Sequence, residues 1–476
     1  MAEGGTLRIG LFGIGLAAYW SQFEGLEARL MGYVERVAER LAGPGREIVN
    51  FGLVDSVEKA FAVGHQARRQ DVDLLVLYVT TYALSSTVLP VVRRAKVPVL
   101  VLNLQPEAAI DYARLNSLPD RTAMTGEWLA FCSACPVPEI ANVFARAGIP
   151  LHQVTGVLDG DPECWREIGD WIAAAQVVET LSHLRLGLMG HYYGGMLDIA
   201  TDLTAVSSVF GTHIEQLEID ELGELRGEVT SGVLAAKLEA FSSEFDIQAD
   251  CSAVELDRAA RTAAALDELV KRHSLGALAY FYNGSGSAMN EDTITSIILG
   301  TSMLTRRGVP VAGEYEVKNV LAMKILDSLG AGGSFTEYYA IDFRDDVVLM
   351  GHDGPGHAGI AEGRIKVKPL AVYHGKVGHG LSVEMSVKNG PVTLLSVAED
   401  GGRFKLLVAE GASEAGPILE IGNTNSRYRF SIGARAFVQR WNEQAPAHHC
   451  AVGVGHVASK LEKLGKLLGI AVVRVC

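Results

Sequence analysis

Residues 72–79, Val72-Asp-Leu-Leu-Val-Leu-Tyr-Val79, are the stretch that decides the fold class. A short, nearly continuous apolar run is typical of a strand buried on both faces of a parallel sheet. Helical patterns flank this strand at Val57–Arg69 and Thr87–Arg94. Further strands of the same kind are expected at Leu7–Phe12, Ile48–Val54 and Pro98–Leu104. The alternation predicts a doubly wound α/β domain over residues 1–180.

The alternation restarts after residue 180 and then gives way to a different pattern. Strands are expected at Leu184–Met189 and Val309–Ala312 with helices between them, which predicts a second doubly wound α/β domain over residues 181–330. Later strands are short and separated by turns: Tyr339–Phe343, Val347–Met350, Arg364–Leu370, Val383–Lys388, Val392–Glu399, Arg403–Ala409 and Tyr428–Ile432. Their spacing predicts an antiparallel, β-rich and barrel-like domain over residues 331–476, with a terminal helix at Val457–Leu468.

Composition and charge exclude several classes of protein. The chain has 476 residues and a formal net charge of −14, whereas a nucleic-acid-binding protein usually shows a basic footprint. No apolar run approaches the roughly 20 residues needed to span a bilayer, and the N-terminus lacks the layout of a signal peptide. The six cysteines do not form a disulfide framework, and Cys132-Ser-Ala-Cys135 has no second cysteine pair that would suggest zinc. We therefore expect a reduced cytoplasmic protein that binds neither nucleic acid nor membrane.

Two glycine clusters follow predicted strands. Gly13-Ile-Gly15-Leu-Ala-Ala18 matches the dinucleotide fingerprint G-x-G-x-x-A and raises a nicotinamide-dependent dehydrogenase as one interpretation. Bulky residues follow directly, so the other interpretation is a turn that presents Tyr19 and Gln22 to a substrate pocket. Gly190-His-Tyr-Tyr-Gly-Gly195 is either a tight strand–helix turn or a polar wall of the active-site cleft.

Carboxylates and histidines recur in four short stretches of the last third of the chain. The stretches are Gly313-Glu314-Tyr315, Ser334-Phe-Thr-Glu337, Met350-Gly-His352-Asp353 and Ala447-His448-His449-Cys450. Each is interpreted as the end of a β-strand that runs into a turn or helix, where α/β proteins place reactive groups. Two carboxylates with two histidines suit Mn²⁺, Co²⁺ or Fe²⁺ and leave coordination positions open for a substrate. Taken singly, each residue also has a structural explanation, such as Glu314 facing a helix dipole.

In this order and spacing, the four stretches resemble the L-arabinose isomerase family, which belongs with L-fucose isomerase among metal-dependent sugar isomerases. The resemblance implies that Glu314, Glu337, His352 and His449 hold the metal and that His448 lies beside the substrate. It also implies Mn²⁺ as the cofactor, with Co²⁺, Fe²⁺ or Mg²⁺ as alternatives. A homo-oligomer, trimer or hexamer, with active sites at subunit boundaries is expected on the same basis.

The substrate-binding set expected beside His448 comprises Tyr338, Tyr19 and Gln22. The chain departs from the family at the loop Ala17-Ala-Tyr-Trp-Ser-Gln22, where family members carry a Gln-His-Leu-Tyr-Gly-type stretch. That loop helps to form the sugar pocket, so the metal chemistry transfers more directly than the identity of the sugar.

The expected function is a divalent-metal-dependent aldose–ketose isomerase acting on a free pentose or related sugar. Glu314 and Glu337 are the expected catalytic carboxylates, one on each side of the substrate, through an enediol or a metal-assisted hydride shift. Asp353 and Lys318 are expected to orient ligands. The alternatives are an epimerase or another enediolate-forming enzyme on the same metal site, a nicotinamide-dependent sugar dehydrogenase and a sugar-binding protein.

Overall fold

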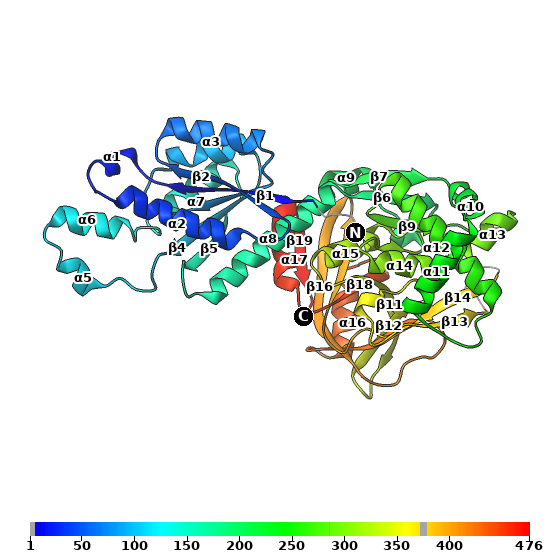
Figure 1. Ribbon diagram of the computed structural model, residues 1–476. Coiled ribbons are helices and arrows are strands. Elements are labelled where there is room, and N and C mark those ends of the chain that lie inside the picture. Colours follow the sequence, from blue (N-terminus) through cyan, green and yellow to red (C-terminus); the bar gives the residue numbers. More distant parts are fainter. Residues whose placement is uncertain (1–4, 285, 372–377) are drawn as a thin grey trace. The chain divides into compact units, whose positions relative to one another are not determined.

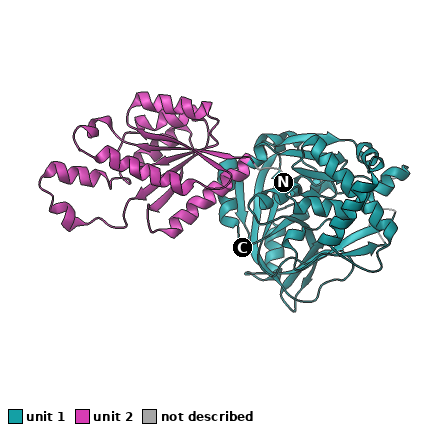
Figure 2. Cartoon of the chain, in the orientation of Figure 1, with its two compact units in different colours: residues 1–3, 180–476 teal, residues 4–179 magenta. Residues whose placement is uncertain are grey.

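The computed structural model describes residues 5–284, 286–371 and 378–476. The chain divides into two compact units, residues 4–179 and residues 180–476, which are coloured separately in Figure 2. Each unit is a folded body with its own sheets and its own core.

The first unit is a five-stranded parallel sheet in the order β2-β1-β3-β4-β5. Its strands are β1 (Leu7–Ile14), β2 (Arg46–Val54), β3 (Leu74–Tyr78), β4 (Val99–Gln105) and β5 (His152–Val157). Its main helices are α2 (Leu26–Leu41), α3 (Val57–Arg69), α4 (Leu89–Ala95), α6 (Arg121–Leu129), α7 (Val137–Ala147) and α8 (Pro162–Ser182), with short helices α1 (Ala17–Trp20) and α5 (Tyr112–Asn116). Every residue of β3 is buried, as the apolar run at 72–79 predicts.

The second unit begins with a four-stranded parallel sheet in the order β10-β9-β6-β7. Its strands are β6 (Arg185–Gly190), β7 (His213–Leu217), β9 (Ala277–Phe281) and β10 (Val311–Ala312). Helices α9 (Leu203–Phe210), α10 (Ile219–Gly227), α11 (Ser231–Glu244), α12 (Ala253–His273), α13 (Ala288–Ile294), α14 (Ile298–Arg306) and α15 (Val317–Ser328) accompany it. Helix α15 is buried along nearly its whole length, because it packs on this sheet and on the barrel that follows (Figure 1).

The barrel contains six antiparallel strands, and a pairing between β15 and β16 closes it. Around the barrel the order is β15 (Gly390–Asp400), β18 (His449–Val454), β11 (Ser334–Asp342), β12 (Val347–His352), β17 (Thr424–Phe430) and β16 (Arg403–Glu414). Strand β19 (Ala471–Arg474) adds to β16 in parallel, and helices α16 (Ala434–Asn442) and α17 (Ala458–Leu468) pack beside the strands. Two parallel-sheet regions followed by an antiparallel barrel confirm the predicted fold class.

Two segments expected among the barrel strands lie elsewhere. Strands β13 (Lys366–Leu370) and β14 (Gly380–Glu384) form a separate three-stranded sheet with β8 (Asp246–Ile247). Arg364 fixes the start of this sheet, because its guanidinium donates to three carbonyl groups at the end of α11, those of Ser242, Ser243 and Phe245. The two-residue strand β8 lies more than a hundred residues upstream, so the local spacing of β13 and β14 cannot reveal the pairing.

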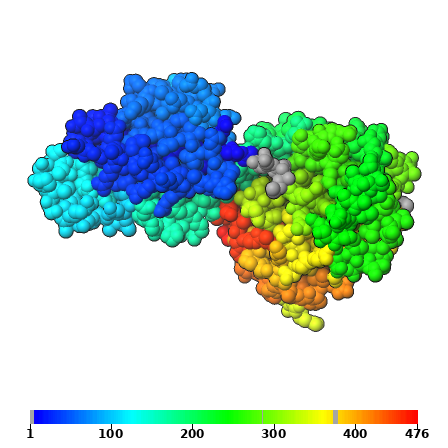
Figure 3. All heavy atoms as spheres, viewed as in Figure 1, coloured from blue at the N-terminus to red at the C-terminus, as the bar shows by residue number. Residues whose placement is uncertain are grey.

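The parallel sheet and the barrel of the second unit share one hydrophobic core. The same cluster of buried side chains includes Leu278 of β9 and Leu299 of α14 together with Val348 of β12 and Val452 of β18. In the space-filling view the green and the yellow-to-orange parts of this unit form one continuous body (Figure 3). A domain boundary near residue 330 therefore stays a prediction.

Candidate active site and metal centre

Glu314 projects from a strained turn between β10 and α15. Glu314 and Tyr315 both have left-handed backbone conformations, with φ of 59° and 63°. The left-handed conformation costs any residue other than glycine about 1–2 kcal/mol, so two such residues in succession must be stabilised by their surroundings. Tyr315 supplies part of it, because its amide donates to the Tyr280 carbonyl and its hydroxyl to Gln216, at 3.1 Å in each case. Backbone strain of this kind is concentrated at functional sites, where it fixes a side chain that an ordinary turn would not present.

The barrel supplies the other three predicted ligands through the register of three neighbouring strands. On β11, Glu337 lies opposite His449 of β18 on one side and opposite Gly351 of β12 on the other. His449 therefore lies beside Glu337, and His352, which follows Gly351 as the last residue of β12, lines the same cavity. Residues opposite one another in an antiparallel pair have neighbouring side chains, about 5 Å apart at Cβ.

The expectation that all four residues follow the ends of strands is only half right. Glu314 follows β10 and His352 ends β12, but Glu337 lies inside β11 and His449 begins β18. In an antiparallel barrel the start of one strand lies beside the end of the next, whereas only in a parallel sheet do functional groups gather at carboxyl ends.

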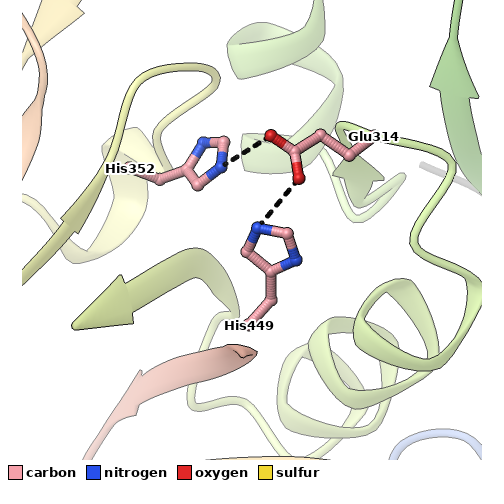
Figure 4. Close-up of side chains that lie close together, drawn as sticks. All are labelled: Glu314, His352 and His449. Carbon is pink, nitrogen blue, oxygen red and sulfur yellow. Dashed lines mark ion pairs between the residues drawn. The ribbon is translucent and has the colours of Figure 1, made fainter. Parts of the chain in front are cut away.

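The side chains of His352 and His449 point at the Glu314 carboxylate from two sides (Figure 4). The Nε2 atom of His449 lies 3.1 Å from Oε2 of Glu314, and Nε2 of His352 lies 3.8 Å from Oε1. One potential ligand atom from each of these three residues lies within 4.8 Å of the other two. Glu337 belongs to a second group of the same size, which it forms with His448 and His449. His449 is therefore common to both groups, and the four predicted ligands lie around it without forming a single four-residue cluster.

Phe335 holds the two histidine rings in place. Its ring lies 4.2 Å from that of His352, edge to face, and 4.5 Å from that of His449. Phe335 is two residues before Glu337 on β11 and is almost completely buried. The contacts restrict rotation of both imidazoles and so preserve their direction toward Glu314.

The charges of Glu314 and His449 stabilise one another. Burial raises the pKa of Glu314, but His449, His352 and His448 outweigh it and lower the pKa below its ordinary value. Burial lowers the pKa of His449, but contact with Glu314 and Glu316 outweighs it and raises the pKa to about 9. In the absence of a metal ion, the cluster is thus a carboxylate–imidazolium pair at neutral pH.

Glu316 is a functional residue that the sequence prediction missed. Its side chain is completely buried, and its Oε2 atom lies 3.6 Å from Nδ1 of His449, on the far side of the ring from Glu314. A carboxylate behind a histidine ligand fixes its ring and increases its basicity. The available signal was a second glutamate two residues after Glu314, but its burial and its partner come from the fold.

A cavity of about 250 Å³ lies beside these residues. Its polar wall includes Glu314, Glu337, His352, Asp353 and His448. Its other side is mainly apolar and aromatic: Tyr193, Met196, Tyr280, Phe281, Ile294, Ile297, Ile298 and Pro355. Of the Gly190–Gly195 motif, Tyr193 thus reaches the cavity. No lysine or arginine is among the described residues that line it.

The remaining predicted residues have different surroundings. His448 lies on the cavity wall, where its Nδ1 atom is 2.6 Å from Oδ2 of Asp198. Lys318 contacts none of the predicted ligands in the interactions found, because its ammonium donates to the carbonyls of Asp198 and Ala200. Tyr338 lines a neighbouring cavity of about 300 Å³ that shares Glu337 and His448, and its ring packs toward Phe437.

Tyr19 and Gln22 belong to the first compact unit, so nothing within the second unit brings them to this cavity. Gln22 lines a separate cavity of the first unit, and Tyr19 packs edge to face on Phe23. The glycine motif before them lacks the long helix of a dinucleotide site, since α1 spans only Ala17–Trp20. A Cβ atom on Gly15 would lie 2.6 Å from the Trp20 ring, so an indole fills the space where a fingerprint leaves room for pyrophosphate.

Comparisons with known proteins relate this chain to sugar isomerases. The family model of the L-arabinose isomerase C-terminal domain matches residues 332–471. A sulfoquinovose isomerase from Alkalicoccus urumqiensis is 21% identical over 85% of this chain and 86% of its own length. L-arabinose isomerases from Erwinia tasmaniensis and Shewanella sp. strain ANA-3 are 25% and 24% identical, over 70% and 64% of this chain and 68% and 63% of their own.

One similar solved structure is titled as a branched chain amino acid ABC transporter from Thermus thermophilus with bound valine. It covers 63% of this chain and 64% of its own at 14% identity, and its TM-score of 0.15 is too low to support a common arrangement. The family match coincides with the barrel that carries Glu337, His352 and His449, and one of the relatives matches most of the chain. The barrel is therefore similar to the L-arabinose isomerase C-terminal domain, and the findings support an L-arabinose isomerase-like family of sugar isomerases for this chain.

Proposed function

We propose that this enzyme is a divalent-metal-dependent aldose–ketose isomerase that acts on a free, uncharged sugar, a pentose or a related sugar. The observation that carries the proposal is the cluster of Glu314, His352 and His449 at one wall of a cavity large enough for a sugar, with Glu337 and His448 beside it. All the relatives named above are sugar isomerases, which supports the class of reaction.

The donor atoms of the cluster fit a divalent cation. Carboxylate oxygen and imidazole nitrogen together suit Mn²⁺, Co²⁺ or Fe²⁺, and Mg²⁺ is a further alternative. The Oε2 atom of Glu314 and both ring nitrogens of His449 are buried and make no hydrogen bond of regular geometry, although Nε2 and Oε2 lie 3.1 Å apart, so a cation between them would supply a better partner. We assign Glu314, Glu337, His352 and His449 as the ligands; a potential ligand atom of Glu337 already lies within 4.8 Å of one of His449. When bound, the cation would polarise the substrate carbonyl and stabilise the negative charge that develops on oxygen.

The two carboxylates have different parts in the proposed reaction. Glu314 is surrounded by three imidazoles, and its lowered pKa keeps it ionised and directed at the metal position. Glu337 lines the same cavity, and it is the group proposed to take a proton from one substrate carbon and return it to the next. A hydride shift between the two carbons would need the same ligands but no base at Glu337.

The cavity lining favours a neutral sugar over an anionic one. The described lining residues include three carboxylates, Glu314, Glu337 and Asp353, and no cationic lysine or arginine. Glu314 and Glu337 would share the charge of the bound cation, so Asp353 is the carboxylate that disfavours a sulfonate or phosphate group, and no lysine or arginine among the described lining residues would pair with that group. The sulfoquinovose isomerase from Alkalicoccus urumqiensis suggests sulfoquinovose, a sulfonated sugar, as an alternative substrate. The lack of a lysine or arginine among the described lining residues argues against it.

The test is ketose formation from a panel of aldopentoses, 6-deoxyhexoses, hexoses and sulfoquinovose, with added Mn²⁺ and after treatment with EDTA. Metal-dependent ketose formation from a neutral sugar is expected. Epimerised aldose without ketose would instead assign the alternative, an epimerase on the same site. Turnover that survives complete removal of metal would refute the metal-dependent mechanism.

By the family resemblance we also propose a cytoplasmic homo-oligomer, trimer or hexamer, in which Tyr19 and Gln22 help to complete a site at a subunit boundary. None of the described helices is long and apolar enough to cross a membrane. Light scattering coupled to size-exclusion chromatography measures the oligomer, and a purely monomeric active enzyme would contradict this proposal.

A further inference from the structure

A carboxylate–imidazole pair at the cavity wall joins two distant parts of the second unit. Asp198 lies in the 3₁₀ turn η2 (Leu197–Ile199) after β6, and His448 immediately precedes β18. The Nδ1 atom of His448 lies 2.6 Å from Oδ2 of Asp198, and the backbone amide of His448 donates to the same oxygen at 2.9 Å. Two contacts to one oxygen fix both the ring and the backbone of His448, across a separation of 250 residues.

The pair determines which ring nitrogen faces the cavity. An ionised carboxylate only accepts hydrogen bonds, so the nitrogen that contacts Asp198 must carry a proton. The other nitrogen, Nε2, points toward the metal-binding side, 3.9 Å from Oε2 of Glu314. With Nδ1 held by Asp198, Nε2 is the ring nitrogen on the side of the cavity, where it can contact a substrate hydroxyl.

The turn that carries Asp198 is itself fixed by a buried cation. The Lys318 ammonium, on a residue only 4% exposed, donates to the carbonyl of Asp198 at 2.7 Å and to that of Ala200 at 3.0 Å. Thr201 adds a hydrogen bond from its amide to the Tyr192 hydroxyl at 3.3 Å. Burying a lysine ammonium costs free energy that two hydrogen bonds to backbone carbonyls offset only in part. This cost is consistent with a turn whose position serves a function.

We propose that Asp198 is a positioning residue for the reaction: it orients His448 so that Nε2 contacts a hydroxyl of the sugar beside the metal. The role rests on the proposed function, since it needs a sugar in the cavity. The geometry resembles the third member of a catalytic triad, whose carboxylate holds a histidine in one tautomer and one orientation. Lys318 supports the arrangement by holding the Asp198 turn.

A double-mutant cycle tests this role through activity. Asp198→Ala is expected to lower kcat/KM by roughly 10–100-fold, as loss of an orienting carboxylate commonly does. In a His448→Gln background the same change is expected to have less than about a threefold effect, because the ring it orients is gone. Asp198→Asn, which keeps the side-chain shape, is the second variant should the alanine variant fail to fold. An equal loss in both backgrounds would show that Asp198 only supports the loop, and would overturn the proposal.

The matched control is Asp202→Asn, which removes a carboxylate four residues away on the same segment. Asp202 caps α9 by accepting from the amides of Thr204 and Ala205, and asparagine caps equally well, so activity is expected to stay within about twofold.

A second readout does not require turnover. In ¹⁵N-histidine NMR spectra at high pH, the His448 signal, assigned by its absence in His448→Gln, is expected to show the proton on Nδ1. Asp198→Ala is expected to abolish this preference while leaving the affinity for Mn²⁺ unchanged. A proton on Nε2 of neutral His448 in the wild-type enzyme would refute the pair. If no sugar is turned over at all, the proposed function fails, and the spectrum still decides the tautomer.

Discussion

Replacing Glu316 with glutamine is expected to change metal affinity without changing folding. It therefore tests directly whether Glu316 supports His449 as a metal ligand. Glu316 is completely buried, neither of its carboxylate oxygens makes a hydrogen bond, and its Oε2 lies 3.6 Å from Nδ1 of His449. The substitution keeps the volume and removes the charge. We expect the affinity for Mn²⁺ to fall while the apoprotein stays folded.

The size of the effect follows from the geometry. Two unit charges about 4 Å apart interact by about 4 kcal/mol at an effective dielectric constant of 20, which is an upper limit for the Glu316–His449 pair. If a metal ion binds, the ring of His449 becomes neutral and is only polarised. The metal-binding free energy lost on removing Glu316 is therefore smaller than this limit. Removal of a carboxylate behind a histidine ligand typically weakens metal binding 10–100-fold, or about 1.4–2.7 kcal/mol. A buried carboxylate without hydrogen bonds contributes little to folding, so the apoprotein melting temperature should be unchanged or raised.

The assay is titration calorimetry with Mn²⁺ on the metal-free protein, together with thermal unfolding in EDTA. Glu384→Gln is the matched control. Glu384 lies on β14 of the separate three-stranded sheet and is also buried, but it accepts hydrogen bonds from the Lys368 ammonium and from the Gly422 amide. That variant should lose stability and keep its metal affinity, which is the opposite pattern. An unchanged Mn²⁺ affinity in Glu316→Gln would refute the idea that Glu316 supports a metal-binding histidine.

Three further outcomes are expected. Glu337→Gln should abolish turnover and weaken Mn²⁺ binding without altering the circular dichroism spectrum, and near-normal activity would contradict the ligand assignment. Because the pKa of His449 is raised to about 9 and a metal needs the neutral ring, Mn²⁺ affinity should rise with pH up to about pH 9. Calorimetry in buffers of different ionisation enthalpy should then show release of about one proton near pH 7.5, and no release would contradict the assignment. Phe437→Ala should cost about 3–5 kcal/mol in denaturant unfolding, because this buried ring stacks on Phe430 at 3.6 Å, and a loss below about 1 kcal/mol would mean that the barrel end is not packed as described.

Local patterns predicted the elements of this fold better than their partners. The apolar run at 72–79 becomes a fully buried strand, and the short strands after residue 333 form a closed barrel. The pairing of β13 with β8 could not be predicted, because a strand of two residues has no periodicity and its position depends on Arg364. The hairpin of β15 and β16 across Gly401-Gly402 is a local feature, but the pairings of β15 and of β11 with β18, which complete the barrel, join segments far apart in sequence.

The candidate site shows the same division between local and distant information. Glu314, Glu337, His352 and His449 could be selected from motifs and family resemblance, but not their grouping around His449. The supporting residues escaped prediction for a physical reason. Glu316 was missed because its burial beside His449 depends on the fold. Asp198 was missed because its partner, His448, is 250 residues away in the sequence, and a local pattern predicts neither feature.

The first residues of α15 and the turn before it explain how one segment can organise the whole site. Within five positions the chain places Glu314 toward the metal position, Glu316 behind His449 and Lys318 under the Asp198 turn. Glu314 and Glu316 face the two nitrogens of the His449 ring from opposite sides, and the raised pKa of His449 shows how their charge is compensated in the absence of a metal ion. On the proposed ligand assignment, a cation bound here would displace the proton of His449, so the charge of the strained turn would be compensated both with and without the ion. Exchange of one proton for one divalent ion would allow this partly buried ligand set to form before the metal binds.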